Sequence, residues 1–249
     1  MFSKMQGAPK PLPSKRRLAS QLWIIVPFML TTTAGILAWW LRDSGEANGL
    51  ERNAKAVLTS LGALVVMDTD RKHVGSVNLS TLKSPEALDQ AIELLPPLAC
   101  LSSLNAAGTM FRDADARVVG QLANLQDLVL SHTAITDSDV EDFQDLSRLK
   151  SIHLSDTAVT NACLPVLGRL RALTIIDLSG TKVTGNFEPL RNLANLNWLV
   201  AGRLSLDAAA IAAIGECPNL SRLTLKGTTC PPEALQKLAE KRPNLTIDQ

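Results

Sequence analysis

The sequence is poor in residues that carry chemistry or cross-links. Its 249 residues include no tyrosine, only three histidines and only four cysteines. No two cysteines have Cys-x-x-Cys spacing, and four are too few for a disulfide scaffold in a chain of this length. Three histidines cannot supply a dense set of metal ligands. We therefore expect no metal site and no other cofactor.

Acidic residues are absent from the first 42 positions. The basic residues in the first 17 positions are Lys4, Lys10, Lys15, Arg16 and Arg17. The rest of the chain carries 20 basic and 24 acidic residues, a net charge of about −4. Binding to the phosphates of nucleic acids requires a basic face. A mildly acidic main part therefore argues against nucleic acid as a partner.

Residues 18–41 contain no charged side chain at all. As a helix this segment would be about 36 Å long, which is enough to span a bilayer. Trp23 lies near one end and Trp39 and Trp40 lie at the other, where tryptophan prefers the membrane boundary. A cleaved signal peptide is the alternative, but its apolar region is only about 7–15 residues long. We expect a transmembrane signal-anchor helix at 18–41.

The flanking charges predict how this helix is oriented. Five basic residues precede the helix, and three follow it within a comparable distance. The positive-inside rule therefore places a basic tail, residues 1–17, in the cytoplasm and everything after residue 41 outside it. For a bacterial protein, that compartment is the periplasm.

A repeat of about 24 residues occupies most of the remaining chain. Residues 125–137, 149–161 and 173–185 share the pattern L-x-x-[LI]-x-L-x-x-T-x-[IV]-T, and the leading leucine recurs at steps of 23 to 25 residues. Alternating apolar residues predict a short strand, and apolar residues three apart then predict a short helix. One unit cannot bury both faces alone, so the units must stack into a solenoid. The leading leucines are Leu101, Leu125, Leu149, Leu173, Leu196, Leu220 and Leu245.

This pattern resembles the leucine-rich repeat family, with the L-x-x-L-x-L-x-x-T-x-V-T-D form common in bacterial proteins. The resemblance implies an α/β fold over residues 74–249: a curved parallel sheet with short helices on its convex side. Leu204 replaces the repeated threonine, so we expect a local distortion there. Cys217 and Cys230 fall in apolar columns of the repeat and should be buried.

Residues 42–73 do not fit the repeat and are expected to cap its N-terminal end. A helix over residues 50–61 would place one apolar face against the core, and residues 63–67 would form a strand that reverses into Val74. The residues of that face are Leu50, Ala54, Val57, Leu58 and Leu61. At the other end of the repeats, the last strand is expected to have an open edge. The charge of Asp248 is the main feature there that disfavours pairing with a strand of another molecule.

Leucine-rich repeat proteins, by resemblance, bind macromolecules on the concave sheet and rarely catalyse reactions. Two outward columns of residues are expected on that sheet. Trp198 is the one tryptophan outside the apolar segment, and its neighbourhood is typical of binding hot spots, although it could equally fold over its neighbours. The expected binding site has an apolar centre with a polar surround, formed by Trp198, Ile175, Val200, Asp127, His153, Asp177 and Arg222.

We also considered catalysis by Ser151, His153 and Asp177, which fall on adjacent strands. No oxyanion-hole loop or enclosed pocket accompanies them in the pattern, so no catalytic residue and no enzymatic activity are expected. The sequence thus predicts a membrane-anchored protein that binds another protein at the cell envelope. The alternatives are a structural, self-associating homo-oligomer and a sensor module for peptide or glycan.

Overall fold

The computed structural model describes residues 45–249, and Ala47–Gln249 form one compact unit. The predicted tail 1–17 and membrane helix 18–41 lie outside these residues. Within the described part of the chain, no helix combines the length and the apolar character needed to cross a membrane.

A single nine-stranded sheet runs through the unit with its strands in chain order. Strand β1 is antiparallel to β2, and every later neighbour is parallel. The strands are β1 (Leu64–Met67), β2 (Val74–Asn78), β3 (Ser103–Asn105), β4 (Asp127–Val129), β5 (Ser151–His153), β6 (Ile175–Asp177), β7 (Trp198–Val200), β8 (Arg222–Thr224) and β9 (Thr246–Asp248).

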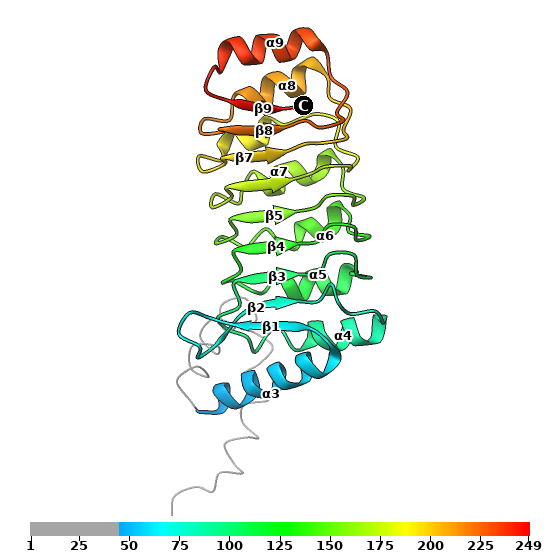
Figure 1. Cartoon of the computed structure of the whole chain (residues 1–249), viewed down its shortest axis with the longest axis vertical. Coiled ribbons are helices and arrows are strands. Elements are labelled where there is room, and N and C mark those ends of the chain that lie inside the picture. The colour runs from blue at the N-terminus through cyan, green and yellow to red at the C-terminus, as the bar shows by residue number, and fades with distance from the viewer. Residues whose placement is uncertain (1–44) are drawn as a thin grey trace, which may run out of the picture. The chain divides into compact units, whose positions relative to one another are not determined.

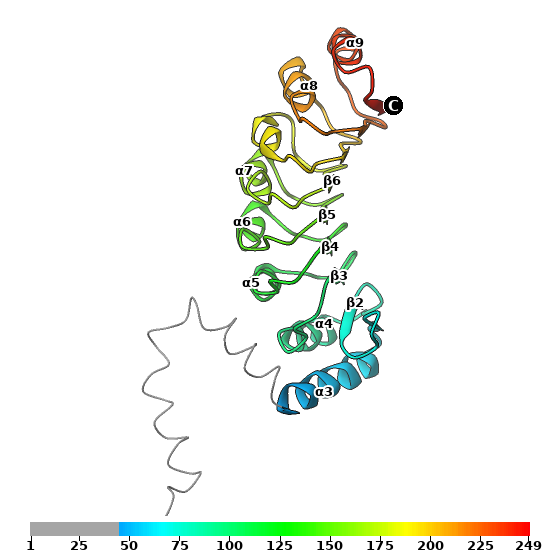
Figure 2. The same ribbon diagram turned by 90° about the vertical axis from the view of Figure 1, so that its left-hand side faces the viewer.

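Helices form a second layer behind the sheet (Figure 1). Figure 2 shows that the stack curves, with the sheet on the inner side and the helices on the outer side. The predicted curved solenoid is confirmed. The α-helices are α3 (Gly45–Leu61), α4 (Pro85–Glu93), α5 (Asp113–Val119), α6 (Asp137–Glu141), α7 (Leu164–Leu167), α8 (Ala208–Gly215) and α9 (Pro232–Lys241). The 3-10 helices are η3 (Asn161–Cys163) and η4 (Glu188–Asn192).

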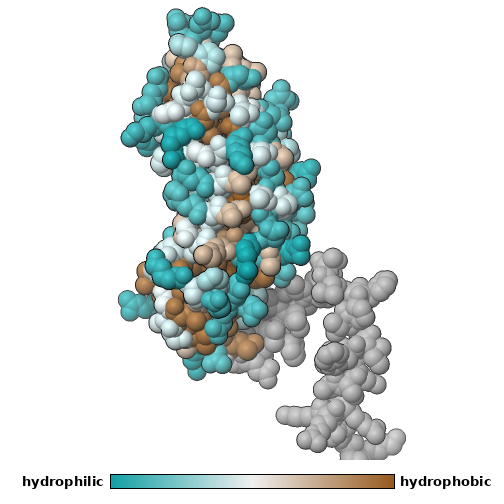
Figure 3. Space-filling model, turned by 90° about the vertical axis from the view of Figure 1, so that its right-hand side faces the viewer, coloured by the Kyte–Doolittle hydropathy of each residue, from teal (hydrophilic) through white to brown (hydrophobic). Residues whose placement is uncertain are grey.

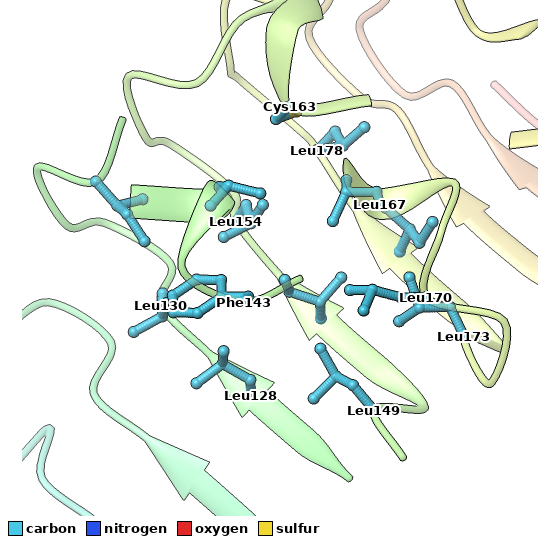
Figure 4. Packing of buried hydrophobic residues seen from close by; sticks show 14 of the residues in the cluster. Leu128, Leu130, Phe143, Leu149, Leu154, Cys163, Leu167, Leu170, Leu173 and Leu178 are labelled. Carbon is cyan, nitrogen blue, oxygen red and sulfur yellow. The ribbon is translucent and has the colours of Figure 1, made fainter. Parts of the chain in front are cut away.

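The repeated apolar residues form one continuous core between the two layers. Leu128 in β4 and Leu130 directly after it both point inward and have no exposed surface, as the period of two predicts. Figure 4 shows their side chains directed into the same cluster as Phe143, which is also fully buried. The helix before Phe143 begins after Thr136, whose backbone N–H donates to Asp139 Oδ2 at 2.7 Å. A side chain thus satisfies one of the donors at this helix start.

A column of threonines closes the turn that follows each of the strands β3 to β6. Each hydroxyl donates a hydrogen bond of 2.6 or 2.7 Å to the carbonyl oxygen three residues earlier. These bonds give each turn carbonyl a donor from a side chain of its own repeat. The residues are Thr109, Thr133, Thr157 and Thr181.

At Leu204, where a local distortion was expected, the backbone turn keeps the conformation of the other repeats and only the hydrogen-bond pattern differs. Leu204 has no hydroxyl to bond Ala201, the residue three positions earlier. Thr228 of the next repeat donates to the Ala201 carbonyl oxygen instead, and it accepts from the Leu204 N–H at 3.2 Å. One threonine therefore satisfies two backbone groups of the preceding repeat.

Replacing Thr228 by valine should lower the free energy of unfolding by about 1–2 kcal/mol, because the buried carbonyl of Ala201 loses its donor. Urea unfolding followed by circular dichroism measures this loss. Thr229→Val is the matched control, because that side chain is exposed. Equal stability of the two variants would contradict the bridging role of Thr228.

At the N-terminal end, α3 packs on the core through Ala54 and Leu58. The predicted helix and strand are confirmed, but the prediction that Leu50 lies on the buried face is wrong, since its side chain is 52% exposed. Glu51 turns inward instead. Its carboxylate accepts a 2.5 Å hydrogen bond from the Val74 N–H and lies 2.8 Å from His73 Nδ1. These bonds to His73 and to Val74, the first residue of β2, fix the rotation of the helix and leave Leu50 outside.

The structure confirms the predicted burial of Cys217 but not that of Cys230, which is only half-buried. Cys230 lies in the repeat that begins at Leu220, in the turn between β8 and α9. Cys163, at the start of α7, is fully buried.

Burial should protect two of these thiols from alkylation, because it raises the pKa of Cys163 to about 12 and that of Cys217 to about 11. The thiolate is the reacting form, so at pH 8 native Cys163 and Cys217 should react with iodoacetamide at least about tenfold more slowly than Cys230. Mass spectrometry measures the three rates, and unfolding in urea should equalise them. Equal rates in the native protein would contradict the packing described here.

Candidate functional site

On the concave side of the sheet, two columns of side chains point away from the hydrophobic core, as predicted. The first and third residues of each strand from β3 to β8, and Ser76 and Asn78 of β2, are paired with equivalent residues on the neighbouring strands. One column is Ser76, Ser103, Asp127, Ser151, Ile175, Trp198 and Arg222. The other is Asn78, Asn105, Val129, His153, Asp177, Val200 and Thr224. We call these two columns the concave face.

Trp198 is held in place by two neighbours on β8. Its indole N–H donates to Thr224 Oγ1 at 3.1 Å, and the Arg222 guanidinium carbon lies 4.8 Å from the ring centroid. The cation over the ring contributes about 0.5–1 kcal/mol at an exposed site. Trp198 is half-buried rather than projecting freely. The indole therefore packs on its neighbours and still forms part of the open face, and its role in binding stays a prediction.

Two apolar side chains adjoin Trp198. Ile175 pairs with it across β6 and β7, and Val200 follows it on the same face of β7. Both are half-buried. Together these three residues make a small apolar area in the C-terminal half of the concave face, and Asp177 lies beside Val200.

Polar residues of the concave face adjoin this area on both sides, and those on the N-terminal side include Ser151 and His153 on β5. His153 Nε2 lies 3.0 Å from Ser151 Oγ, and His153 Nδ1 lies 3.7 Å from Asp177 Oδ2. Burial opposes ionisation of Asp177, but its contacts with His153 and Ser179 lower its pKa below the usual value. The carboxylate is therefore ionised at neutral pH, and it gives this part of the face a negative charge.

The same three residues are those considered above for catalysis. The order Ser151, His153, Asp177 matches a nucleophile, a base and an orienting carboxylate. Ser151 has only 6% of its surface exposed, however, and the 3.7 Å separation between His153 and Asp177 is longer than a hydrogen bond. This arrangement restricts access to the serine oxygen. The expectation that the chain is not an enzyme stays a prediction.

The predicted site residues do not all come together. Five of them, Ile175, Asp177, Trp198, Val200 and Arg222, lie on the adjacent strands β6 to β8, and His153 lies on β5 beside them. Asp127 is exposed on β4, three strands from Trp198 and so about 14 Å away. A partner must therefore cover at least five strands to contact the whole predicted set.

One polar cluster was not predicted from the sequence. Asp156 and Arg203 both have left-handed backbone conformations in the turns that follow their strands, and Arg203 Nη2 lies 2.6 Å from Asp156 Oδ2. This ion pair crosses Gly180, where any Cβ would touch both side chains. His132 Nδ1 lies 3.5 Å from the same carboxylate. Asp156 and His132 thus lie along the edge of the sheet rather than in the middle of the concave face.

Glycines at the equivalent turn positions of other repeats could have indicated where this cluster lies. Gly108, Gly180 and Gly227 occupy equivalent turn positions and have positive φ, so His132, Asp156 and Arg203 follow the same turn geometry.

Among the described residues, no group of three or more histidine, cysteine, aspartate or glutamate side chains is arranged to hold a metal ion.

Comparisons with known proteins agree with the fold. Neither a scan against protein-family models nor a search of curated proteins gave a match. A solved leucine-rich repeat protein of Leptospira interrogans superimposes with a TM-score of 0.50 at 19% identity, covering 68% of this chain and 52% of that one. The chain thus spans about half the length of the Leptospira protein.

Two internalins of Listeria monocytogenes are also similar. Internalin C2 is 19% identical with a TM-score of 0.49, covering 82% of this chain and 91% of its own. Internalin F is 16% identical with a TM-score of 0.45, covering 68% of this chain and 57% of its own. The resemblance drawn from the repeat is confirmed: this chain has the leucine-rich repeat fold.

Proposed function

We propose that this chain is a membrane-anchored leucine-rich repeat protein that binds another protein through its concave face at the cell envelope. The anchor is residues 18–41, with residues 1–17 in the cytoplasm and the repeats outside it. The apolar length of that segment and the basic residues before it support this topology. The fold supports protein binding, because solenoids present extended concave surfaces.

The observation that carries the proposal is the grouping of Trp198, Ile175 and Val200 on adjacent strands of an open sheet. Aromatic and aliphatic side chains surrounded by polar groups are characteristic of the centres of protein interfaces. Backbone hydrogen bonds between neighbouring strands hold all three in place before binding. A preformed surface loses little conformational entropy when a partner docks.

A crosslinking pull-down from envelope extract tests this proposal, with the full chain as bait. The wild-type chain should enrich a defined partner, and the double variant Trp198→Ala, Ile175→Ala should recover at least about tenfold less, because hot-spot truncations cost about 2 kcal/mol or more. The control is Lys237→Ala on the exposed side of α9, which should recover the partner normally. The same recovery with all three baits would refute binding at the concave face.

Self-association is a second candidate, and one specific observation favours it. Leu64 and Val66 of β1 are 57% and 59% exposed, and Leu50 of α3 is exposed at the same end. Hydrophobic side chains gather at that end of the described unit in Figure 3. Exposed apolar groups on a terminal strand favour contacts between copies. A concentration-dependent increase in mass, abolished by Leu64→Ser with Val66→Thr, would support this alternative.

A further inference from the structure

Arg222 is fixed more firmly than an ordinary surface arginine. Its guanidinium stacks over the Trp198 ring, and its Nε donates to Asp248 Oδ2 at 2.8 Å. Asp248 lies on β9, so the arginine is held by residues on the strands at either side of its own. Since both contacts restrict the same side chain, much of the rotamer entropy that a flexible arginine loses on binding is already lost.

The two terminal amino groups of Arg222 are available to bind a ligand. Within the described part of the chain, Nη1 and Nη2 donate to no other residue, and half of the side chain is exposed. A guanidinium presents these donors in one plane with fixed spacing, which matches the two oxygens of a carboxylate. The apolar area formed by Ile175, Trp198 and Val200 begins immediately beside this fork.

We propose that Arg222 receives an aspartate or glutamate side chain of the protein partner, flanked in the partner by apolar side chains that cover Ile175 and Val200. This inference rests on the proposed function and specifies the chemistry of its partner. The charges nearby favour a single carboxylate over a phosphate. Asp177 and Asp248 lie close to the same surface and would repel a dianion more strongly than a group of charge −1.

The test uses two soluble probe peptides, N-acetyl-Leu-Glu-Leu amide and its Gln counterpart, titrated into the full chain in detergent micelles. The observable is the NMR resonance of the Trp198 indole N–H, assigned with a Trp198→Phe variant. The Glu peptide should shift this resonance saturably, with an affinity at least about tenfold higher than that of the Gln peptide, because hydrogen bonds to charged groups are the stronger ones.

Arg222→Lys keeps the charge but removes the planar fork, so it should reduce the affinity for the Glu peptide to that for the Gln peptide. Arg148→Lys is the matched control, since that arginine donates to Asn124 away from the strands of the concave face, and the Glu response should be unchanged. No shift with the Glu peptide, or equal shifts with both peptides, would overturn the proposal. An equal response to glucuronic acid would also overturn it, because the carboxylate would then not be specific to a protein.

These results separate the inference from the proposed function. If the concave double variant loses its partner while Arg222→Lys retains it and the peptides do not differ, the face binds protein without a carboxylate. If the Glu peptide binds through Arg222 but no protein depends on Trp198 and Ile175, the local chemistry is correct and the proposed function is wrong.

Discussion

Replacing Phe143 by alanine should lower the free energy of unfolding by about 3–5 kcal/mol. The ring is fully buried and belongs to the cluster that includes Leu128, Leu130 and Leu154 (Figure 4). Truncation removes apolar surface from the core and leaves a cavity between the sheet and the helices. A solenoid has neighbours on both sides of each repeat, so the surrounding backbone cannot collapse far into that space.

Urea unfolding monitored by circular dichroism measures this loss. Phe143→Leu is the matched variant, because it keeps an apolar side chain and leaves a smaller void, so it should lose clearly less stability. A loss under about 1 kcal/mol for Phe143→Ala would mean that the repeats are not packed as closely as described.

Replacing Gly120 by alanine should destabilise the protein by about 3 kcal/mol, at the upper end of the usual range for overpacking. Gly120 ends α5 with an ordinary negative φ, so its role is not a turn that only glycine adopts. An added Cβ would instead collide with the carbonyl oxygen of Asp142 in the next repeat. Because that atom belongs to the backbone, the two repeats would have to separate. Gly168 has the same relation to the Pro189 carbonyl oxygen, at 2.6 Å.

Thermal unfolding of Gly120→Ala and Gly185→Ala provides the comparison. Gly185 has no atom within 4 Å of an added Cβ and no positive φ, so alanine there should leave the melting temperature nearly unchanged. Equal melting temperatures for the two variants would contradict the close approach of neighbouring repeats at Gly120.

The repeat architecture could be predicted because its signal is local and recurs many times. Spacings of 23 to 25 residues between leucines determine which residues face inward, and a strand period of two then determines which face outward. Neighbours across the sheet follow from the repeat alone. For this reason the sequence is sufficient to place Ile175, Trp198 and Arg222 side by side.

Side-chain contacts between repeats could not be predicted in the same way. Nothing in the local pattern indicates that Thr228 supplies the hydroxyl missing at Leu204, since that bond joins two repeats. The outward Leu50 also follows from a long-range interaction, because the buried carboxylate of Glu51 binds β2. The spacing of apolar residues predicts which face of an amphipathic helix is buried. It gives no information about a polar side chain that is buried because it forms a hydrogen bond.

The most direct test of the central claim, that the concave face binds a protein, is site-specific photocrosslinking in intact cells. A benzoylphenylalanine introduced at Ile175 should give one adduct of defined mass on illumination, and the same probe at Lys237 on α9 should give none. An adduct from Ile175 alone would establish protein binding at the concave face. No adduct from Ile175, or the same adduct from both positions, would contradict it.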